Sequence, residues 1–354
     1  MSAFRHRSDE LPRRASGPIG RLDALTTLHP RRTISHLPEP FLLERELLPK
    51  VWGGRALADT LGIELPDDGV AIGESWELFD RPAGSSRIRG SDQTLAELTR
   101  RWPEELVGRG VPLGHDGAFP LMLKFLDARE ALSLQVHPDD GQAHGDLGKD
   151  ECCLVLATTD EARFVHGLRP GVEKEQLLLA LESSEVEELV YAFRPQVGQL
   201  VHVPPGTPHA MGPGVVAFEI QENSDLTYRC YDWGRSREVQ PEEARDVVQM
   251  VHNERPPVER STSLVDGGEL LLVTEHFSVR RYQISHGLEL PTKGRYLTVT
   301  CLDGSGRLGW QRDGRAASVP LQRPDTALVP ACTGTVTVEP DGPVDLVVCG
   351  PGAR

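Results

Sequence analysis

The chain has 354 residues, of which 38% are hydrophobic and 26% are charged, a composition typical of a globular protein and not of a largely disordered one. Its formal net charge of −15 argues against nucleic acid or an anionic membrane as a partner. No apolar run approaches the roughly 18 residues that suggest a membrane-spanning helix. If the substrate is anionic, the basic residues that bind it must therefore act locally against an acidic molecule.

The six cysteines show no CxxC spacing, so the sequence suggests neither a Cys-ligated zinc site nor a disulfide framework. We therefore expect a cytoplasmic protein. The N-terminal segment is rich in arginine but lacks the apolar stretch of a secretory signal, and we expect residues 1–36 to form a disordered tail.

From Pro38 onward, short apolar runs separated by Gly and Pro predict β-structure. Helical spacing is less frequent and interrupts the β pattern without alternating with it. We therefore predict a mainly β fold of barrel or sandwich type with helical insertions. The predicted strands include residues 70–79, 120–126, 131–137, 151–157, 198–204 and 214–221, and the predicted helices cover residues 94–108, 172–193 and 242–251.

The segment LSLQVHPDD, residues 132–140, alternates polar and apolar side chains. In a strand, Ser133, Gln135 and His137 share one face, while Leu134 and Val136 share the other. A solvated strand face explains this alternation, and so does a set of ligands around a metal ion.

A second segment, GQLVHVPPGTPHAMG at residues 198–212, follows the pattern G-x5-P-x-G-x2-H. The Pro-Pro-Gly-Thr-Pro run predicts a tight turn between two apolar strands, with His209 just after the turn. This pattern resembles the second conserved motif of the cupin barrels, in which the histidine points inward and binds a metal.

The order Gln-x-His, then Lys-x-Glu, then a downstream His resembles the type I phosphomannose isomerases, which are zinc enzymes on a cupin scaffold. The segments KFLDAREALSLQVHPDD (124–140), NSDLTYRCYDWGR (223–235), VWGG (51–54) and GESWE (73–77) carry the same resemblance. The resemblance implies a cupin-type barrel or jelly-roll catalytic domain with helical insertions at residues 37–255. It also implies a smaller β-rich, cupin-like domain at residues 256–354.

Residue by residue, the resemblance implies one Zn²⁺ per chain, bound by Gln135, His137, Glu151 and His209. Two imidazoles and one carboxylate are ordinary zinc ligands. Because the Gln135 amide is neutral, only one ligand charge offsets the metal, and the site keeps a net positive charge of about one. Such a charge suits a Lewis acid that faces a carbonyl and an adjacent hydroxyl.

The resemblance also implies a pocket for substrate around the metal. It places Ser133 at the substrate phosphate, and Lys124, Lys149 and Arg229 along the pocket wall. We expect the guanidinium of Arg229 to face phosphate or a developing enediolate. The proton-transfer base is either Lys149, if its pKa is depressed by zinc and Arg229, or Asp225.

The predicted activity is the reversible isomerisation of mannose 6-phosphate and fructose 6-phosphate, and the predicted partner is a phosphorylated hexose bound by a monomer or a homodimer. One alternative is an isomerase of another sugar phosphate such as glucose 6-phosphate, which the Gln-x-His order disfavours. Another is a non-catalytic, sugar-binding metal cupin, against which the presence of Ser133, Lys149 and Arg229 beside a full ligand set argues.

Overall fold

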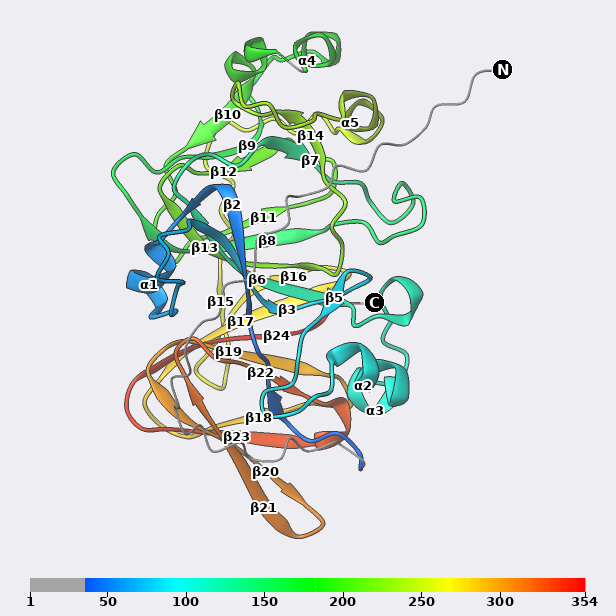
Figure 1. The fold of residues 1–354 in the computed structure, drawn as a ribbon, viewed down its shortest axis with the longest axis vertical. Helices are drawn as coiled ribbons and strands as arrows, with labels where there is room; N and C mark the ends of the chain where they lie inside the picture. Colours follow the sequence, from blue (N-terminus) through cyan, green and yellow to red (C-terminus); the bar gives the residue numbers. More distant parts are fainter. Residues whose placement is uncertain (1–35, 182, 354) are drawn as a thin grey trace, which may run out of the picture. The chain divides into compact units, whose positions relative to one another are not determined.

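The computed structural model describes residues 36–181 and 183–353, so the predicted tail lies outside the described residues except for its last position. The described residues form a mainly β structure whose sheets stack in layers (Figure 1). The predicted fold class is therefore confirmed. None of the helices in this part of the chain is both long and apolar enough to cross a membrane.

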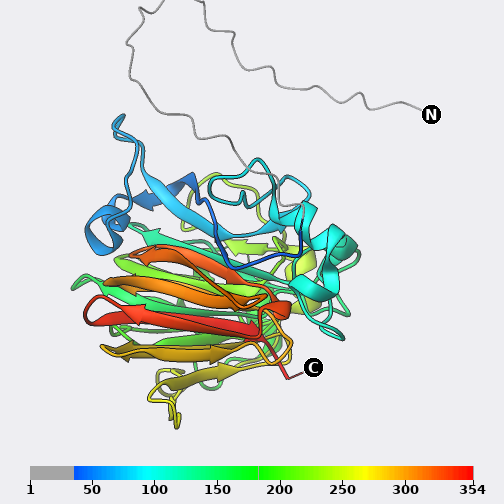
Figure 2. The ribbon, with the colours of Figure 1, turned by 90° about the horizontal axis from the view of Figure 1, so that it is seen from below.

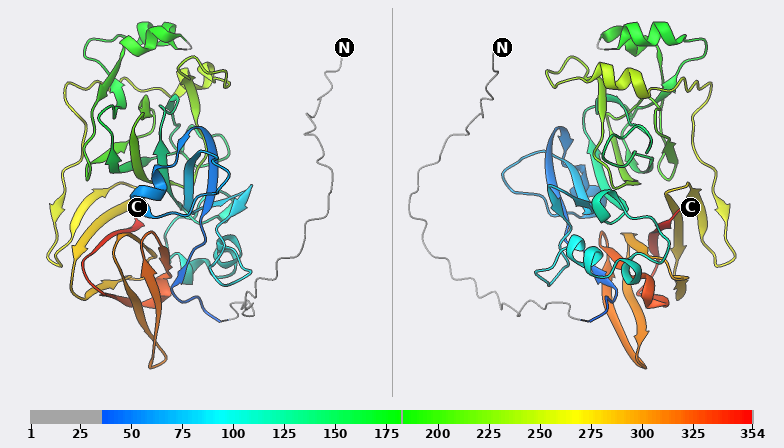
Figure 3. Two further views of the ribbon diagram at one scale, coloured as in Figure 1. Left: turned by 60° about the vertical axis from the view of Figure 1, so that its left-hand side comes forward. Right: turned by 90° about the vertical axis from the view of Figure 1, so that its right-hand side faces the viewer.

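The first layer is a five-stranded sheet that carries Gln135, His209 and Arg229 on three of its strands. Its strands, in spatial order, are β10 (Val190–Phe193), β9 (Phe164–Leu168), β12 (His209–Met211), β7 (Leu134–Val136) and β14 (Tyr228–Tyr231). Its outer face packs against helices α4 (Lys174–Ala180) and α5 (Pro241–Val247), which lie beside this sheet in both views of Figure 3.

The second layer is a six-stranded antiparallel sheet that carries Lys124, Glu151 and Glu219. Its strands, in spatial order, are β11 (Leu200–Val203), β8 (Glu151–Thr158), β13 (Val215–Glu222), β6 (Leu121–Ala128), β3 (Ile72–Leu78) and β2 (Glu46–Gly54). Successive side chains on these strands point to opposite faces. One face therefore meets the five-stranded sheet, and the other meets the C-terminal strands.

The C-terminal part of the chain adds two further sheets (Figure 2). The first is ordered β1 (Phe41–Leu42), β22 (Thr326–Val329), β19 (Leu297–Asp303), β24 (Val344–Pro351), β17 (Phe277–Ile284), β16 (Glu269–Val273) and β15 (Thr262–Ser263). The second is ordered β18 (Leu288–Pro291), β23 (Thr335–Pro340), β20 (Ser305–Arg312) and β21 (Arg315–Gln322). Strand β1 pairs with β22, so the start of the described chain belongs to a C-terminal sheet. The boundary at residues 255 and 256 stays a prediction.

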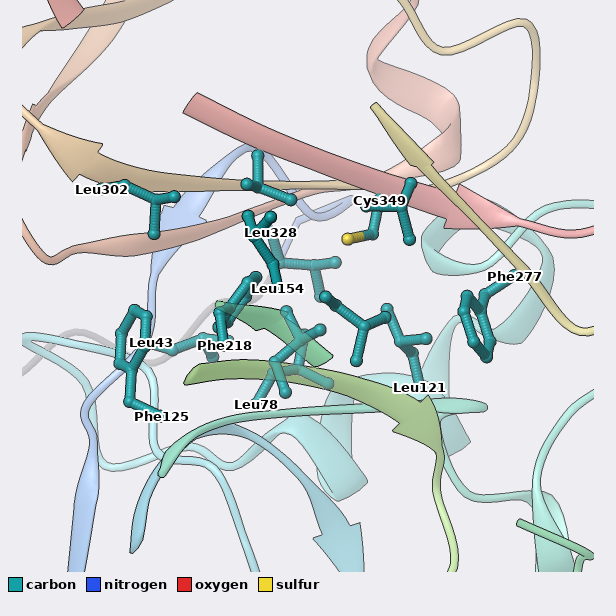
Figure 4. Close-up of a cluster of buried hydrophobic side chains, with 14 of the residues drawn as sticks. Leu43, Leu78, Leu121, Phe125, Leu154, Phe218, Phe277, Leu302, Leu328 and Cys349 are labelled. Atoms are coloured by element: carbon teal, nitrogen blue, oxygen red, sulfur yellow. The ribbon is translucent and has the colours of Figure 1, made fainter. Parts of the chain in front are cut away.

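A buried core joins the six-stranded sheet to the C-terminal sheet (Figure 4). Phe125, Phe218 and Leu154 face this core from the six-stranded sheet, and Phe277 and Cys349 face it from the C-terminal sheet. The rings of Phe125 and Phe218 lie 4.9 Å apart between centroids. The strands that carry the site on their inner face are thus anchored by aromatic and aliphatic packing on their outer face.

The predicted strands are found within a few residues of their expected bounds, but all three helix predictions need correction. Residues 94–108 form two short helices, α2 (Leu95–Arg101) and α3 (Pro103–Leu106), because Pro103 lacks an N–H and disfavours helical backbone at Trp102. The helix predicted for residues 172–193 ends with α4 at Ala180 and is followed by the 3-10 turn Ser184–Glu188. Its last residues form strand β10, which pairs with β9. The helix predicted for residues 242–251 is shorter, as α5.

The remaining elements are short. They are α1 (Ala56–Leu61), the two-residue strands β4 (Asp80–Arg81) and β5 (Gly84–Ser85), and the 3-10 turns His115–Gly117 and Ala331–Thr333.

Candidate active site

The turn between β11 and β12 places His209 at the start of its strand, as the sequence predicts. Gly206 has a φ of +81°, and a Cβ at this position would lie 2.4 Å from Gln249 and 2.8 Å from the carbonyl oxygen of Val247. Only glycine fits this conformation and this space without strain. The Gly206 N–H donates to the carbonyl oxygen of His137 at 2.7 Å, which ties the turn to β7.

Three of the predicted metal ligands converge between the two sheets. His137, Glu151 and His209 are all buried, and one ligand atom from each lies within 4.8 Å of the other two. The Glu151 carboxylate lies 3.0 Å from Nε2 of His209 and 3.6 Å from Nε2 of His137. Two imidazoles and one carboxylate therefore point at one place.

The outer nitrogen of each imidazole is held by backbone. Nδ1 of His137 lies 2.8 Å from the carbonyl oxygen of Leu226, and Nδ1 of His209 lies 2.9 Å from that of Thr207. Since a carbonyl only accepts, each Nδ1 carries a proton, and Nε2 is the nitrogen of each ring that faces Glu151. Burial, together with the nearby Lys149 ammonium, lowers the pKa of His137 to about 3, so this imidazole is neutral, as a metal ligand must be.

Lys149 lies directly beside this group. Its Nζ is 2.6 Å from Glu151 and 3.3 Å from Nε2 of His137. Burial alone would lower the pKa of Lys149, but the carboxylates of Glu151 and Glu219 outweigh it, and the pKa lies above its usual value. Burial alone would likewise raise the pKa of Glu151, but Lys149 and His137 hold it well below its usual range. The depression of the Lys149 pKa by zinc and Arg229 stays a prediction, because the raised pKa reflects only the neighbouring protein groups.

Gln135 lies next to the three ligands but presents its amide nitrogen, which is 3.2 Å from Nε2 of His209. Its oxygen instead accepts a long hydrogen bond of 3.4 Å from the hydroxyl of Ser133. A 180° rotation of the amide exchanges the two atoms and turns the oxygen toward His209. Gln135 is thus placed as the sequence predicts, and it needs this rotation to act as a ligand.

The residues present fit a divalent metal ion. Two imidazole Nε2 atoms and a carboxylate face one point, and both imidazoles have the fixed outer hydrogen bond typical of metal-binding histidines.

A cavity of about 450 Å³ opens beside these ligands. The remaining predicted site residues all line this cavity: Ser133, Lys124, Arg229 and Asp225. Lys149 and Gln135 line it as well. Lys124 and Glu219 are opposite each other on β6 and β13 and form a buried ion pair of 3.3 Å. Lys124 also lies 5.5 Å from the ring centroid of Trp76. The structure therefore brings all the predicted pocket residues together.

Arg229 differs from the other cations of the cavity. Lys50, Lys124, Lys149 and Arg237 each pair with a carboxylate. Arg229 has no carboxylate partner within the described part of the chain, and donates instead to the carbonyl oxygen of Glu238 at 2.5 Å. Its buried Nε finds no acceptor among the described atoms. Burial and the nearby charge of Arg237 lower the pKa of Arg229. An anionic ligand in the cavity would supply the partner that this guanidinium lacks.

Asp225 lines the cavity with a half-exposed side chain, but its carboxylate is bound from behind. Nε of Arg81 lies 3.1 Å from Oδ2 of Asp225. Asp225 is therefore an ion-paired residue at the rim of the pocket.

Sequence reasoning missed several charged pocket residues, among them Glu219, Glu74, Lys50 and Arg237. Glu219 carried a usable signal, because it interrupts the apolar run VVAFEIQ just as Lys124 interrupts PLMLKFL. Two isolated opposite charges in apolar strands each need a buried partner, and the two are partners here. Glu74 and Lys50 form a further ion pair of 3.1 Å at the cavity wall. Both lie in or beside the segments GESWE and VWGG that carry the family resemblance, but nothing in those segments assigned them a role.

The fold and this site define a metal-binding β-barrel protein of the cupin class. Residues 41–161 match the family model described as "Phosphomannose isomerase type I, catalytic domain". The protein GmuF of Bacillus subtilis, named a probable mannose-6-phosphate isomerase, is 32% identical over 321 residues, which cover 86% of this chain and 97% of that protein. The chain belongs to the type I phosphomannose isomerase family.

Two further comparisons agree with this assignment. The mannose-6-phosphate isomerase of Streptococcus mutans is 32% identical over 287 residues, or 77% of this chain and 87% of that protein. The crystal structure of the mannose 6-phosphate isomerase from Bacillus subtilis superposes with a TM-score of 0.77 at 30% identity, covering 88% of this chain and 99% of that one. The likeness thus extends beyond the catalytic segment to nearly all of the described chain.

Proposed function

We infer that the protein catalyses the reversible isomerisation of mannose 6-phosphate and fructose 6-phosphate. The observation that carries this inference is the convergence of His137, Glu151 and His209 beside a cavity lined by Arg229, whose guanidinium has no carboxylate partner among the described residues. A phosphorylated, ring-opened hexose brings both a carbonyl with an adjacent hydroxyl and an anion. The two halves of the site suit these two groups.

We propose that the metal is one Zn²⁺ ion held by His137, Glu151, His209 and, after rotation of its amide, Gln135. The donor set supports zinc, since imidazole nitrogen and carboxylate oxygen are its usual ligands. When bound, zinc supplies a Lewis acid that polarises the substrate oxygens and stabilises negative charge as it develops.

The protein's own groups would bind the substrate and move its proton. Arg229, Lys124 and Ser133 offer donors to phosphate or to a developing enediolate. Lys149 lies 2.6 Å from Glu151, and with its pKa depressed by zinc and Arg229 it is one candidate for the proton-transfer base. Three carboxylates line the cavity, those of Glu74, Asp225 and Glu219, and Asp225 and Glu219 are the further candidates to accept the C2 proton.

A coupled assay with mannose 6-phosphate and with glucose 6-phosphate, before and after chelation and after zinc is restored, tests this function. We expect turnover of mannose 6-phosphate only, its loss on chelation and its recovery with zinc. H209A and Q135A should lose zinc and turnover. The control H286A should keep both, because His286 is exposed and lies between β17 and β18, in the C-terminal part of the chain. Turnover of glucose 6-phosphate alone would favour a glucose 6-phosphate isomerase. Turnover of neither sugar phosphate by the zinc-loaded protein would favour a non-catalytic, sugar-binding cupin.

The proton acceptor is tested separately with D225N and E219Q. Loss of solvent-hydrogen exchange at C2, with substrate binding retained, identifies the residue that removes the proton; unchanged exchange in both variants excludes both carboxylates.

We further propose that the protein acts in the cytoplasm as a monomer or homodimer. All six cysteines are free, as a reducing compartment favours.

A further inference from the structure

Arg81 lies outside the substrate cavity yet connects strand β4 to two loops that carry residues of the site. It is the second residue of the short strand β4, and its side chain is 9% exposed. Its guanidinium forms a bidentate pair with Asp146, with NH1 3.0 Å from Oδ1. It also binds the Asp225 carboxylate and donates to the carbonyl oxygen of Asn223. One side chain therefore holds two loops against β4 through four contacts.

Each of the two loops carries groups of the site. Asp146 belongs to the loop that leads from β7 to β8, and three residues further on this loop presents Lys149 and then Glu151. Asn223 and Asp225 belong to the loop between β13 and β14, which lines the cavity with Asp225 and Thr227. The two loops also touch directly, because the Ser224 hydroxyl donates to the carbonyl oxygen of Leu147 at 2.9 Å.

The second loop ends in a contact to a metal ligand. The carbonyl oxygen of Leu226, one residue after Asp225, accepts from Nδ1 of His137 at 2.8 Å. This hydrogen bond fixes both the tautomer and the ring orientation of His137. The partner of the outer nitrogen of a metal-binding histidine commonly changes metal affinity by 10- to 100-fold when it is removed. The position of Leu226 is therefore part of the metal site, although its side chain is not.

Simple stabilisation of the fold does not account for this arrangement well. A buried ion pair can usually be replaced by apolar packing without loss of stability. Arg81 instead binds two carboxylates and a carbonyl on the two loops that carry Lys149, Glu151 and Leu226, and its planar fork fixes their direction as well as their distance.

We propose that Arg81 is a positioning residue for the metal site, which acts by holding the loop around Asp146 and the loop of Asn223–Leu226 so that Leu226 orients His137. The proposal rests on the proposed metal site at His137, Glu151 and His209. It assigns a role in metal affinity to a residue that touches neither the metal ligands nor the substrate cavity.

The test compares R81M and R81K with R281M in the full chain. Arg281 is a matched control, because it forms a bidentate pair with Asp345 at 2.9 and 2.6 Å on a C-terminal sheet. Zinc affinity is measured by competition with a chelating dye, and the visible spectrum of the Co²⁺-loaded protein reports the ligand geometry. Thermal unfolding of the chelator-treated protein reports stability.

We expect R81M to bind zinc 10- to 100-fold more weakly and to change the Co²⁺ spectrum, with partial recovery in R81K. R281M should lose stability but keep zinc affinity within about twofold, as a role in folding alone would predict. An R81M protein with the zinc affinity and Co²⁺ spectrum of the unaltered chain would overturn the proposal, whatever its stability.

If R81M does not fold, the zinc affinity of D146N tests the proposal instead. This substitution removes half of the bidentate pair with Arg81 and keeps the shape of the side chain. A three- to tenfold weaker zinc affinity supports the proposal, and an unchanged affinity overturns it. Failure of the proposed function is seen separately, as a lack of mannose 6-phosphate turnover by the unaltered, zinc-loaded chain.

Discussion

Replacement of Arg229 by Met should separate activity from stability. The guanidinium has a buried Nε without an acceptor among the described atoms, and its pKa is lowered by burial and by Arg237. The charged guanidinium of Arg229 therefore contributes unfavourably to the folding free energy of the ligand-free protein. R229M loses one hydrogen bond to the Glu238 carbonyl, worth about 1 kcal/mol, but it also relieves the repulsion from Arg237. The free energy of unfolding should change by less than about 1 kcal/mol.

The effect on catalysis should be much larger, because the substrate anion supplies the missing acceptor. A hydrogen bond to a charged group contributes about 1.5–3 kcal/mol, which corresponds to a loss of about 10- to 150-fold in kcat/KM. Steady-state kinetics and urea unfolding of R229M measure the two quantities.

Arg235 provides the control, since it already pairs with Asp232 and donates to the carbonyl oxygen of Ala131. R235M should therefore lose more stability than R229M. A kcat/KM of R229M within threefold of the unaltered protein, or a stability loss above about 2 kcal/mol, would refute this reasoning.

Three further predictions concern stability and are measured by chemical denaturation. K124M should cost about 3–5 kcal/mol because it leaves the buried carboxylate of Glu219 without its partner, and the double variant K124M/E219L should regain most of this loss; equal costs for single and double variants would contradict the pairing. F218A should cost about 3–5 kcal/mol by opening a cavity beside Phe125, and a loss below about 1 kcal/mol would show that this interface is not packed as described. Burial raises the pKa of Asp127, so the folded chain holds this proton more tightly than the unfolded chain, and the Asp127 contribution to stability falls as pH rises through the raised pKa. The unaltered chain should therefore gain stability relative to D127N between about pH 7 and about pH 4, and a constant difference would argue against the raised pKa.

Local pattern predicted the strands well because alternation is a property of the strand itself. In β7, the polar residues face the site and Leu134 and Val136 face the core under α4 and α5. The helix prediction for residues 172–193 was wrong at its end, where apolar residues at helical spacing form a strand. Residues 190–193 carry apolar side chains at helical spacing after α4, yet they pair with β9 as strand β10. That pairing is a long-range contact, which a local period cannot reveal.

The same distinction divides the site residues. Gln135, His137, Glu151 and His209 lie in short segments whose spacing resembles a known family, and the structure brings them together. Arg81 could not be found in this way, because its role depends on three carboxylate and carbonyl groups from loops far away in the sequence. As a sequence feature it is an ordinary arginine between an aspartate and a proline. Only the fold gives it partners.

The two faces of the six-stranded sheet explain how the protein can hold so many buried charges. Lys124 and Glu219 face the cavity, while their chain neighbours Phe125 and Phe218 face the C-terminal sheet and pack against each other. The charged face costs free energy through desolvation, and the apolar face offsets this cost on the same strands. Because consecutive residues of a strand cannot move independently, packing on the outer face also fixes the positions of the charged side chains on the inner face. The C-terminal sheet therefore supports the active site without contributing a residue to the cavity wall among the described positions.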